Sequence, residues 1–196
     1  MRRNIYLIRH GECADKQQGE QKFSAPDVCM SEYGVKQVKN LRNTSLMENV
    51  KIVYISPLPR AEHTARILFG GIKDIQIKDC INFKEIDFGA CNGKFFNDDH
   101  EIYRLWQLSP DMLQFPNGDK MIDYIDRTNV AFKRILKNEN SCDIALVAHS
   151  ITIRAIVLRI LSLDPKYIRR IPCDNASITV ICEEEDCLSL RSLNII

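Results

Sequence analysis

The chain opens with Asn4-Ile5-Tyr6-Leu7-Ile8-Arg9-His10-Gly11-Glu12, an apolar run that stops abruptly at an Arg-His-Gly triplet. A short run rich in β-branched and aromatic residues, bounded by glycine, indicates a buried strand. In α/β proteins, ligands bind just beyond the carboxyl ends of the sheet strands. We therefore expect Arg9 and His10 to face a ligand crevice.

Two later segments repeat this design. A second apolar strand leads into Ser56 and Pro57, which suit the cap and the first position of a helix that carries Arg60 in its first turn. A third strand, predicted at 144–148, runs directly into His149 at the start of another helix. We expect these junctions to bring two guanidinium groups and two imidazoles to one edge of a sheet.

The alternation of strands and helices predicts an α/β fold. We expect a three-layer α/β/α sandwich with a mostly parallel sheet, helices on both faces and an antiparallel terminal strand. The 196 residues, 45% of them hydrophobic, suffice for one domain over 1–196. Residues 95–117 are rich in aromatics and prolines, which indicates a small insertion or lid. Its Phe96 and Trp106 are expected to pack the insertion rather than contact substrate.

The composition limits which partners and which cellular compartment we expect for the protein. Lys and Arg total 27 against 26 Asp and Glu, so no bulk charge favours nucleic acid or a membrane surface. Eight cysteines without a C-x-x-C pair indicate reduced thiols. The apolar stretch before Arg9 is too short for a secretory signal. We expect a cytoplasmic protein with a small-molecule partner, and no sequence feature indicates an oligomeric state.

The basic groups at the junctions suit phosphate chemistry. Guanidinium groups and helix N-termini bind phosphate oxygens, and an imidazole can attack phosphorus. The nucleophile would be His10, which must be neutral to attack, and like-charge repulsion from Arg9 and Arg60 opposes its protonation. Together with His149, these groups predict a phosphoryl-transfer site that needs no metal or other cofactor.

Several blocks in this order and spacing resemble those of the histidine phosphatase superfamily, the phosphoglycerate mutase-like proteins. The resemblance spans nearly the whole chain. The blocks are 7–12 with the RHG signature, 27–34 with Gln37, 56–61 with Thr64, 85–89 with an E-x-x-x-G pattern, 147–149 and 175–177.

The resemblance implies a metal-independent phosphatase that hydrolyses small phosphate monoesters. It implies that His10 becomes a phosphohistidine and that Arg9, Arg60 and His149 hold the phosphate. It also implies that Glu85 protonates the leaving group and then activates water, with a pKa raised by the anionic phosphate.

Some positions leave alternatives open or depart from the family pattern. Asp87 stands two residues after Glu85, and either carboxyl could face the site. Ser150 follows the second histidine where the family usually has glycine, so we expect phosphate binding with altered room for substrate. Lys16 stands where asparagine is common and could meet a second anionic group. We count Gly11, Lys16 and Ser150 as substrate-binding residues.

Other functions compete with the phosphatase. A phosphoglycerate mutase-type phosphotransferase would keep water out, and the short 95–117 segment favours a more open site. A catalytically inactive phosphate-binding or interaction module would have the same fold without the catalytic activity. A metal centre built from His10, Glu12 and Cys13 fits poorly, because near-adjacent ligands cannot easily form a tetrahedron. The sequence leaves open which phosphate ester is the substrate.

Overall fold

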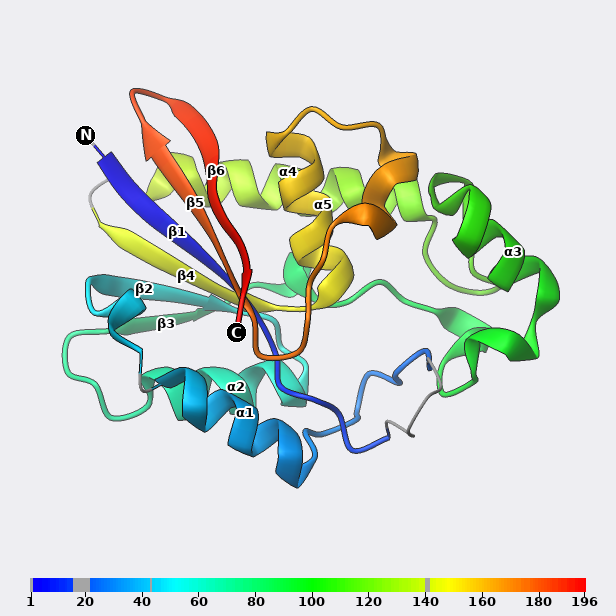
Figure 1. The fold of residues 1–196 in the computed structure, drawn as a ribbon, viewed down its shortest axis with the longest axis horizontal. Coiled ribbons are helices and arrows are strands. Elements are labelled where there is room, and N and C mark those ends of the chain that lie inside the picture. The colour runs from blue at the N-terminus through cyan, green and yellow to red at the C-terminus, as the bar shows by residue number, and fades with distance from the viewer. Residues whose placement is uncertain (1, 16–21, 43, 140–141) are drawn as a thin grey trace.

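A six-stranded sheet forms the middle layer of the computed structural model, which describes residues 2–15, 22–42, 44–139 and 142–196 (Figure 1). The spatial order is β3-β2-β4-β1-β5-β6. The strands are β1 (Arg2–Arg9), β2 (Val50–Ile55), β3 (Gln76–Asp79), β4 (Asp143–Ala148), β5 (Ile178–Glu184) and β6 (Cys187–Ile195). The first four are mutually parallel, β5 is antiparallel to β1, and β6 is antiparallel to β5. The mostly parallel sheet is confirmed, with the antiparallel hairpin of β5 and β6 at its end.

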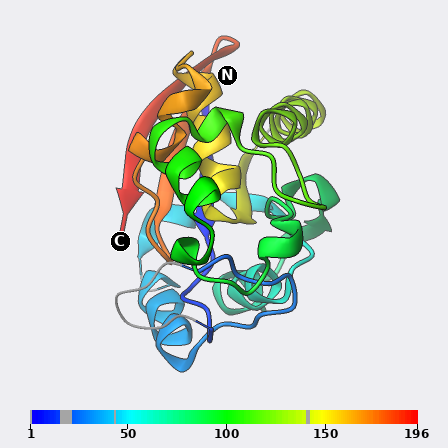
Figure 2. The same ribbon diagram turned by 90° about the vertical axis from the view of Figure 1, so that its right-hand side faces the viewer.

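Helices cover both faces of the sheet (Figures 1 and 2). On one face lie α1 (Glu32–Arg42) and α2 (Pro59–Phe69), and on the other lie α4 (Met121–Asn138) and α5 (Ser150–Ile160). The short helix α3 (His100–Leu108) lies beyond the carboxyl ends of the parallel strands. No helix in the described part of the chain is long and apolar enough to cross a membrane.

Strand β1 is buried on both faces, which explains its continuous apolar sequence. Successive side chains of a strand point to opposite faces. Ile5 and Leu7 accordingly join the core that packs against α4 and α5, and Tyr6 and Ile8 join the core beneath α1 and α2. Because β1 is covered on both sides, its packing fixes the position of Arg9 at its end and of His10 directly after it.

The start of α1 packs against the loop that follows β1. The Ser31 hydroxyl accepts the Gly34 N–H at 2.9 Å and so caps the start of the helix. A Cβ on Gly34 would lie 2.2 Å from the Glu12 carbonyl oxygen, and one on Gly11 would lie 2.5 Å from the Gly34 oxygen. The two backbone segments can approach this closely only because both positions are glycine. This contact fixes the backbone next to His10.

Helix α2 starts two residues later than the sequence suggests. Pro59 occupies the first turn and Leu58 is the cap residue, whereas Ser56 and Pro57 were expected in these roles. Either proline suits a first helical position, since both lack the N–H that would be unsatisfied there. The Ser56 hydroxyl accepts the Leu58 N–H at 3.3 Å and also contacts the second histidine.

The connections between β3 and α4 consist mainly of short turns. Residues 75–92 contain β3 and the 3₁₀ turns Ile81–Phe83 and Gly89–Cys91. Two further 3₁₀ turns, Phe96–Asp98 and Pro110–Met112, flank α3. The remaining ones are Ser45–Met47, which precedes β2, and Pro165–Arg170, which follows α5.

Candidate active site

The four parallel strands end at the same edge of the sheet and deliver the predicted residues there. His10 follows β1, Arg60 lies in α2 after β2, Glu85 lies in the loop after β3, and His149 follows β4. Backbone hydrogen bonds continue past the strand ends: the His10 N–H donates to the Ala148 carbonyl at 3.1 Å. The topology therefore converts positions distant in sequence into neighbours in space.

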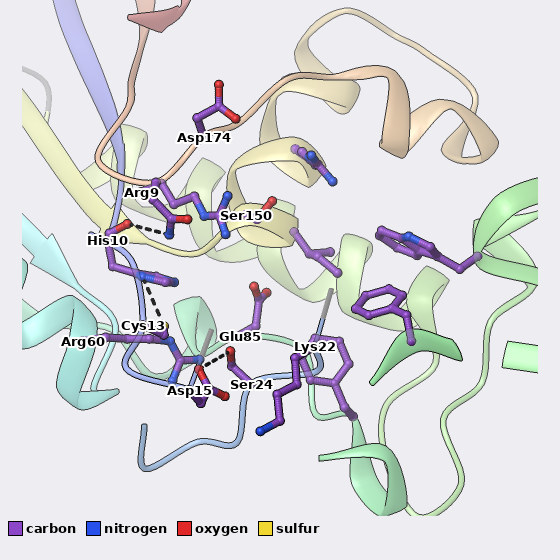
Figure 3. A pocket seen from close by; sticks show the side chains of 16 residues that line it. Arg9, His10, Cys13, Asp15, Lys22, Ser24, Arg60, Glu85, Ser150 and Asp174 are labelled. Atoms are coloured by element: carbon purple, nitrogen blue, oxygen red, sulfur yellow. Dashed lines mark hydrogen bonds between the residues drawn. The ribbon is translucent and has the colours of Figure 1, made fainter. Parts of the chain in front are cut away.

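A cavity of about 330 Å³ opens at this edge (Figure 3). Figure 3 shows the labelled side chains of His10, Glu85 and Ser150 turned toward the same space. Arg9 and Arg60 also line it. Four of the five predicted catalytic residues thus line a single cavity, and the fifth, His149, is not among the lining residues.

His10 is held in the neutral form that a nucleophile requires. Its Nδ1 lies 2.7 Å from the Gly11 carbonyl oxygen, and because that oxygen can only accept, Nδ1 carries the proton. The lone pair then resides on Nε2. Burial lowers the pKa of His10 well below its usual value, and the charges of Arg9 and Arg60 lower it further. The predicted repulsion from the two arginines contributes to the lowered pKa of His10, but burial away from solvent is the larger cause.

Arg9 and Arg60 are anchored by backbone carbonyls. Arg9 Nη1 donates to the Cys173 carbonyl at 2.6 Å. Arg60 Nη1 donates to the carbonyls of Ala25 at 3.1 Å and Pro26 at 3.2 Å. The Nε atoms of both arginines are buried and have no hydrogen-bond partner among the described residues. Buried donors without acceptors are costly, so these preset guanidinium groups are suited to an anion.

His149 lies directly behind His10. It is fully buried, and the centroids of the two imidazole rings are 5.1 Å apart. Its Nε2 lies 2.7 Å from the Ser56 hydroxyl oxygen, and its Nδ1 has no partner among the described residues. A Ser56 hydroxyl that donates to Nε2 selects the tautomer with its proton on Nδ1. Burial, followed by the charge of Arg60, lowers the pKa of His149 well below its usual value.

Glu85, rather than Asp87, lies on the cavity wall. Its Oε1 accepts the Ile86 N–H at 3.1 Å, and burial raises its pKa against the opposing charges of Arg60 and Arg9. The pKa of Glu85 is raised as predicted, although the main cause in the structure is burial. Asp87 instead accepts the Gly89 N–H at 2.9 Å and braces its own loop.

A buried pair of hydroxyl groups, on Tyr124 and Thr152, supports Glu85, and the sequence analysis singled out neither residue. The Tyr124 hydroxyl lies 3.3 Å from Glu85 Oε1 and 2.7 Å from Thr152 Oγ1. Burial and the charge of Glu85 raise the pKa of Tyr124 well above its usual value, so it stays a donor. The pair positions the Glu85 carboxyl from α4 and α5.

Tyr124→Phe should reduce kcat about three- to tenfold on alkyl phosphates, the effect of losing one neutral hydrogen bond. The bond favours the ionised carboxyl, so its loss should move the alkaline limb of the pH profile to higher pH. Steady-state kinetics over a pH series would measure both effects. Tyr33→Phe, at an exposed position, is the control. An unchanged alkaline limb would contradict the positioning role.

The predicted substrate-binding residues have different outcomes. Ser150 begins α5 and lines the cavity. Gly11 is not among the lining residues, and its N–H donates to Thr64 Oγ1 at 3.3 Å, so we assign it a packing role. Lys16 lies outside the described residues.

Aromatic residues of the 95–117 segment form the far wall of the cavity. Phe96 and Trp106 pack against each other with ring centroids 5.6 Å apart, as expected of an insertion core. Both also line the cavity, so the same rings pack the insertion and face the site. The physical reason is that α3 lies over the strand ends, a placement that local pattern does not specify.

Further polar residues line the cavity without having been singled out in the sequence. They are Asp15, Lys22, Ser24, Arg154 and Asp174. For Arg154 a signal existed, because it stands four residues after Ser150 and thus on the same face of the helix. Within the described ranges, no cluster of three or more His, Cys, Asp or Glu side chains is arranged to hold a metal ion.

Comparison with known proteins agrees with the resemblance seen in the sequence blocks. The sequence pattern of the histidine phosphatase superfamily (branch 1) matches residues 5–196. Phosphoserine phosphatase 1 of Hydrogenobacter thermophilus is 29% identical over 196 residues, which cover 97% of this chain and 92% of that protein. The metal-independent phosphoserine phosphatase of Arabidopsis thaliana is 28% identical, over 80% of this chain and 68% of that protein.

A solved structure shows the same fold. The α-ribazole phosphatase from Shigella flexneri superposes with a TM-score of 0.85 at 22% sequence identity. The match covers 97% of this chain and 96% of that chain. The three-layer arrangement is therefore that of a known architecture.

Proposed function

The chain belongs to the histidine phosphatase superfamily, and we propose that it hydrolyses small phosphate monoesters through a phosphohistidine on His10. The carrying observation is the meeting of Arg9, His10, Arg60 and Glu85 around one cavity, with His149 directly behind. A neutral nucleophile, preset anion donors and a carboxyl of raised pKa are the parts that this reaction requires.

In the first step, His10 Nε2 attacks phosphorus in line with the leaving oxygen. The P–N bond forms as the P–O bond breaks, and Glu85 gives its proton to the departing alkoxide. Arg9, Arg60 and His149 donate to the three remaining phosphate oxygens, where charge is spread in the transition state. The products of this step are an alcohol, a phosphohistidine and an ionised Glu85.

In the second step, Glu85 acts as a base. Its carboxylate takes a proton from water while the water oxygen attacks phosphorus and the P–N bond breaks. Inorganic phosphate leaves, His10 regains its lone pair, and Glu85 is again protonated. One carboxyl thus serves both half-reactions, as microscopic reversibility allows.

The relatives support hydrolysis over the mutase and over an inactive binding module, and they make phosphoserine the first ester to test. We further propose one domain in which 95–117 acts as a lid, because this segment supplies one wall of the cavity. Eight free cysteines support a cytoplasmic location, and the nearly balanced charge supports a small-molecule partner rather than nucleic acid.

The test is phosphate release from a panel of phosphate monoesters, with and without exhaustive chelation. We expect turnover of at least one small ester, unchanged by the chelator. Rapid quenching with labelled substrate should trap protein-bound phosphate that is stable to base and labile to acid. Release without a trapped intermediate would contradict the His10 mechanism, and absence of both would contradict the phosphatase.

A further inference from the structure

A second cavity lies apart from the catalytic one, between the carboxyl end of α3 and the 3₁₀ turn Pro165–Arg170. These two segments lie side by side in both views of the ribbon (Figures 1 and 2). The volume of this cavity is about 420 Å³, and none of the described residues lines both cavities. We call it the α3 pocket, and the mechanism above uses none of its residues. They are Gln107, Leu108, Lys166, Tyr167, Arg169 and Arg170.

The α3 pocket carries an excess of positive charge. Three of the described residues that line it are cations, and none is a carboxylic acid. Lys166 pairs with Asp164 at 3.0 Å, whereas the two arginines form no ion pair in the described ranges. Asp111, on the 3₁₀ turn that packs against Pro165–Arg170, does not line the pocket. One carboxylate against three cations leaves two positive charges unbalanced.

Neutral groups hold these cations in place. The Tyr167 ring attracts two of them, since its centroid lies 5.1 Å from Lys166 Nζ and 4.6 Å from Arg170 Cζ. Arg169 Nη1 donates to the Gln107 carbonyl at 3.0 Å and to the Gln107 side-chain oxygen. Such contacts fix the cations without neutralising them. A guanidinium has five N–H donors, so both arginines keep donors for a further acceptor.

The excess charge of the α3 pocket selects among anions. A phosphate group carries close to two negative charges near neutral pH, and its oxygens accept paired hydrogen bonds from guanidinium groups. A carboxylate brings one charge, so it would leave half of the excess unbalanced. A volume of about 420 Å³ lies in the range of small-molecule sites and is larger than one phosphate group needs. Charge and size therefore favour a phosphate-bearing anion.

We propose that the α3 pocket is a second binding site for a phosphate-bearing anion, separate from the site of phosphoryl transfer. None of the described residues that line it is a histidine, a cysteine or a carboxylic acid. We therefore assign it binding and no chemistry. This inference does not depend on the proposed phosphatase function.

Arg169 connects the α3 pocket with the wall of the catalytic cavity. Its Cζ lies 5.5 Å from the centroid of the Trp106 ring, and Trp106 lines the catalytic cavity. Burial lowers the pKa of Arg154, which lines the same cavity, and the charge of Arg169 lowers it further. An anion bound to Arg169 thus adds negative charge directly behind this wall, and the Trp106 ring should respond to it.

The test is calorimetry with methylenediphosphonate, a diphosphate analogue whose P–C bonds resist hydrolysis. The unaltered protein should bind two molecules per chain, one in each cavity, and Arg169→Ala/Arg170→Ala should bind one. If the catalytic cavity does not bind the analogue, these numbers become one and none, so failure of the phosphatase proposal is recognised separately. Trp106 is the only tryptophan of the chain, so its fluorescence should show the binding step that the double variant loses.

Two further variants serve as controls. Arg170→Ala leaves the contacts of Arg169 with Gln107 and Trp106 in place, and should still weaken the α3 pocket about tenfold or more. Lys133→Ala removes an exposed cation of α4 outside both cavities and should bind like the unaltered protein. Unchanged binding in the double variant, or an equal loss in Lys133→Ala, would overturn the proposal.

Inorganic phosphate, the product of the proposed reaction, is the second probe and identifies the source of the anion. Binding that is weakened in Arg170→Ala would make the α3 pocket a sensor of that product. Binding of methylenediphosphonate alone would assign the pocket to a larger phosphate-bearing metabolite. Both results support the second site, and binding of neither probe there would overturn it.

Discussion

Replacing His10 by alanine should lower kcat for every phosphate monoester by about four to six orders of magnitude, the loss seen when a nucleophile is removed. The structure supports this expectation because the Gly11 carbonyl fixes the proton on Nδ1 and burial keeps the ring neutral. Arg9, Arg60 and His149 stay in place, so phosphate binding should change by less than about tenfold. Stopped assays and calorimetry with the same ester would measure kcat and binding separately.

The control for this prediction is His63→Ala, because His63 is exposed on α2. It should keep full activity and should still trap base-stable phosphate on the protein. The His10→Ala variant should trap none. If His10→Ala kept more than about one hundredth of the activity, direct attack by water would replace the phosphohistidine mechanism.

Glu85→Gln should separate substrates by the basicity of their leaving group. An alkoxide needs a proton as it departs, so kcat on alkyl phosphates should fall about 10²- to 10⁴-fold. Nitrophenolate leaves without protonation, so the first step with p-nitrophenyl phosphate should change little. The measurement is burst and steady-state kinetics on both substrates, which separates transfer to His10 from hydrolysis of the phosphohistidine.

The pH profile of the same variant gives an independent check. His10 must be neutral and its pKa is lowered, so the acid limb lies below the usual histidine range. Glu85 must be protonated in the first step, and burial raises its pKa, so activity falls only as the pH rises through that raised value. The Gln side chain does not titrate, so the alkaline limb should vanish in Glu85→Gln.

Asp87→Asn is the matched control for Glu85→Gln, because Asp87 braces the loop and does not line the cavity. It should lose stability more than activity, with equal effects on both leaving groups. If Asp87→Asn showed the selective loss on alkyl phosphates and Glu85→Gln did not, the proton donor would be Asp87.

Much of the fold and of the site could be predicted because it depends on local pattern. The apolar run before Arg9 and the one before His149 indicate strands with both faces covered, which β1 and β4 are. The start of α2 was misplaced because Pro57 and Pro59 satisfy the same local rule. Sequence pattern had no means of choosing between them.

The sequence by itself determined the strand-to-helix junctions, and with them the sheet edge to which Arg9, His10, Arg60 and His149 belong. Only the tertiary structure decided that Glu85 and not Asp87 faces the cavity, and that the buried Nε of Arg154 has no hydrogen-bond partner in the described part of the chain. Junctions follow from hydrophobic periodicity and cap residues within a few positions. Burial, proton placement and unpaired charge depend instead on distances between segments far apart along the chain, which are set only when those segments pack together.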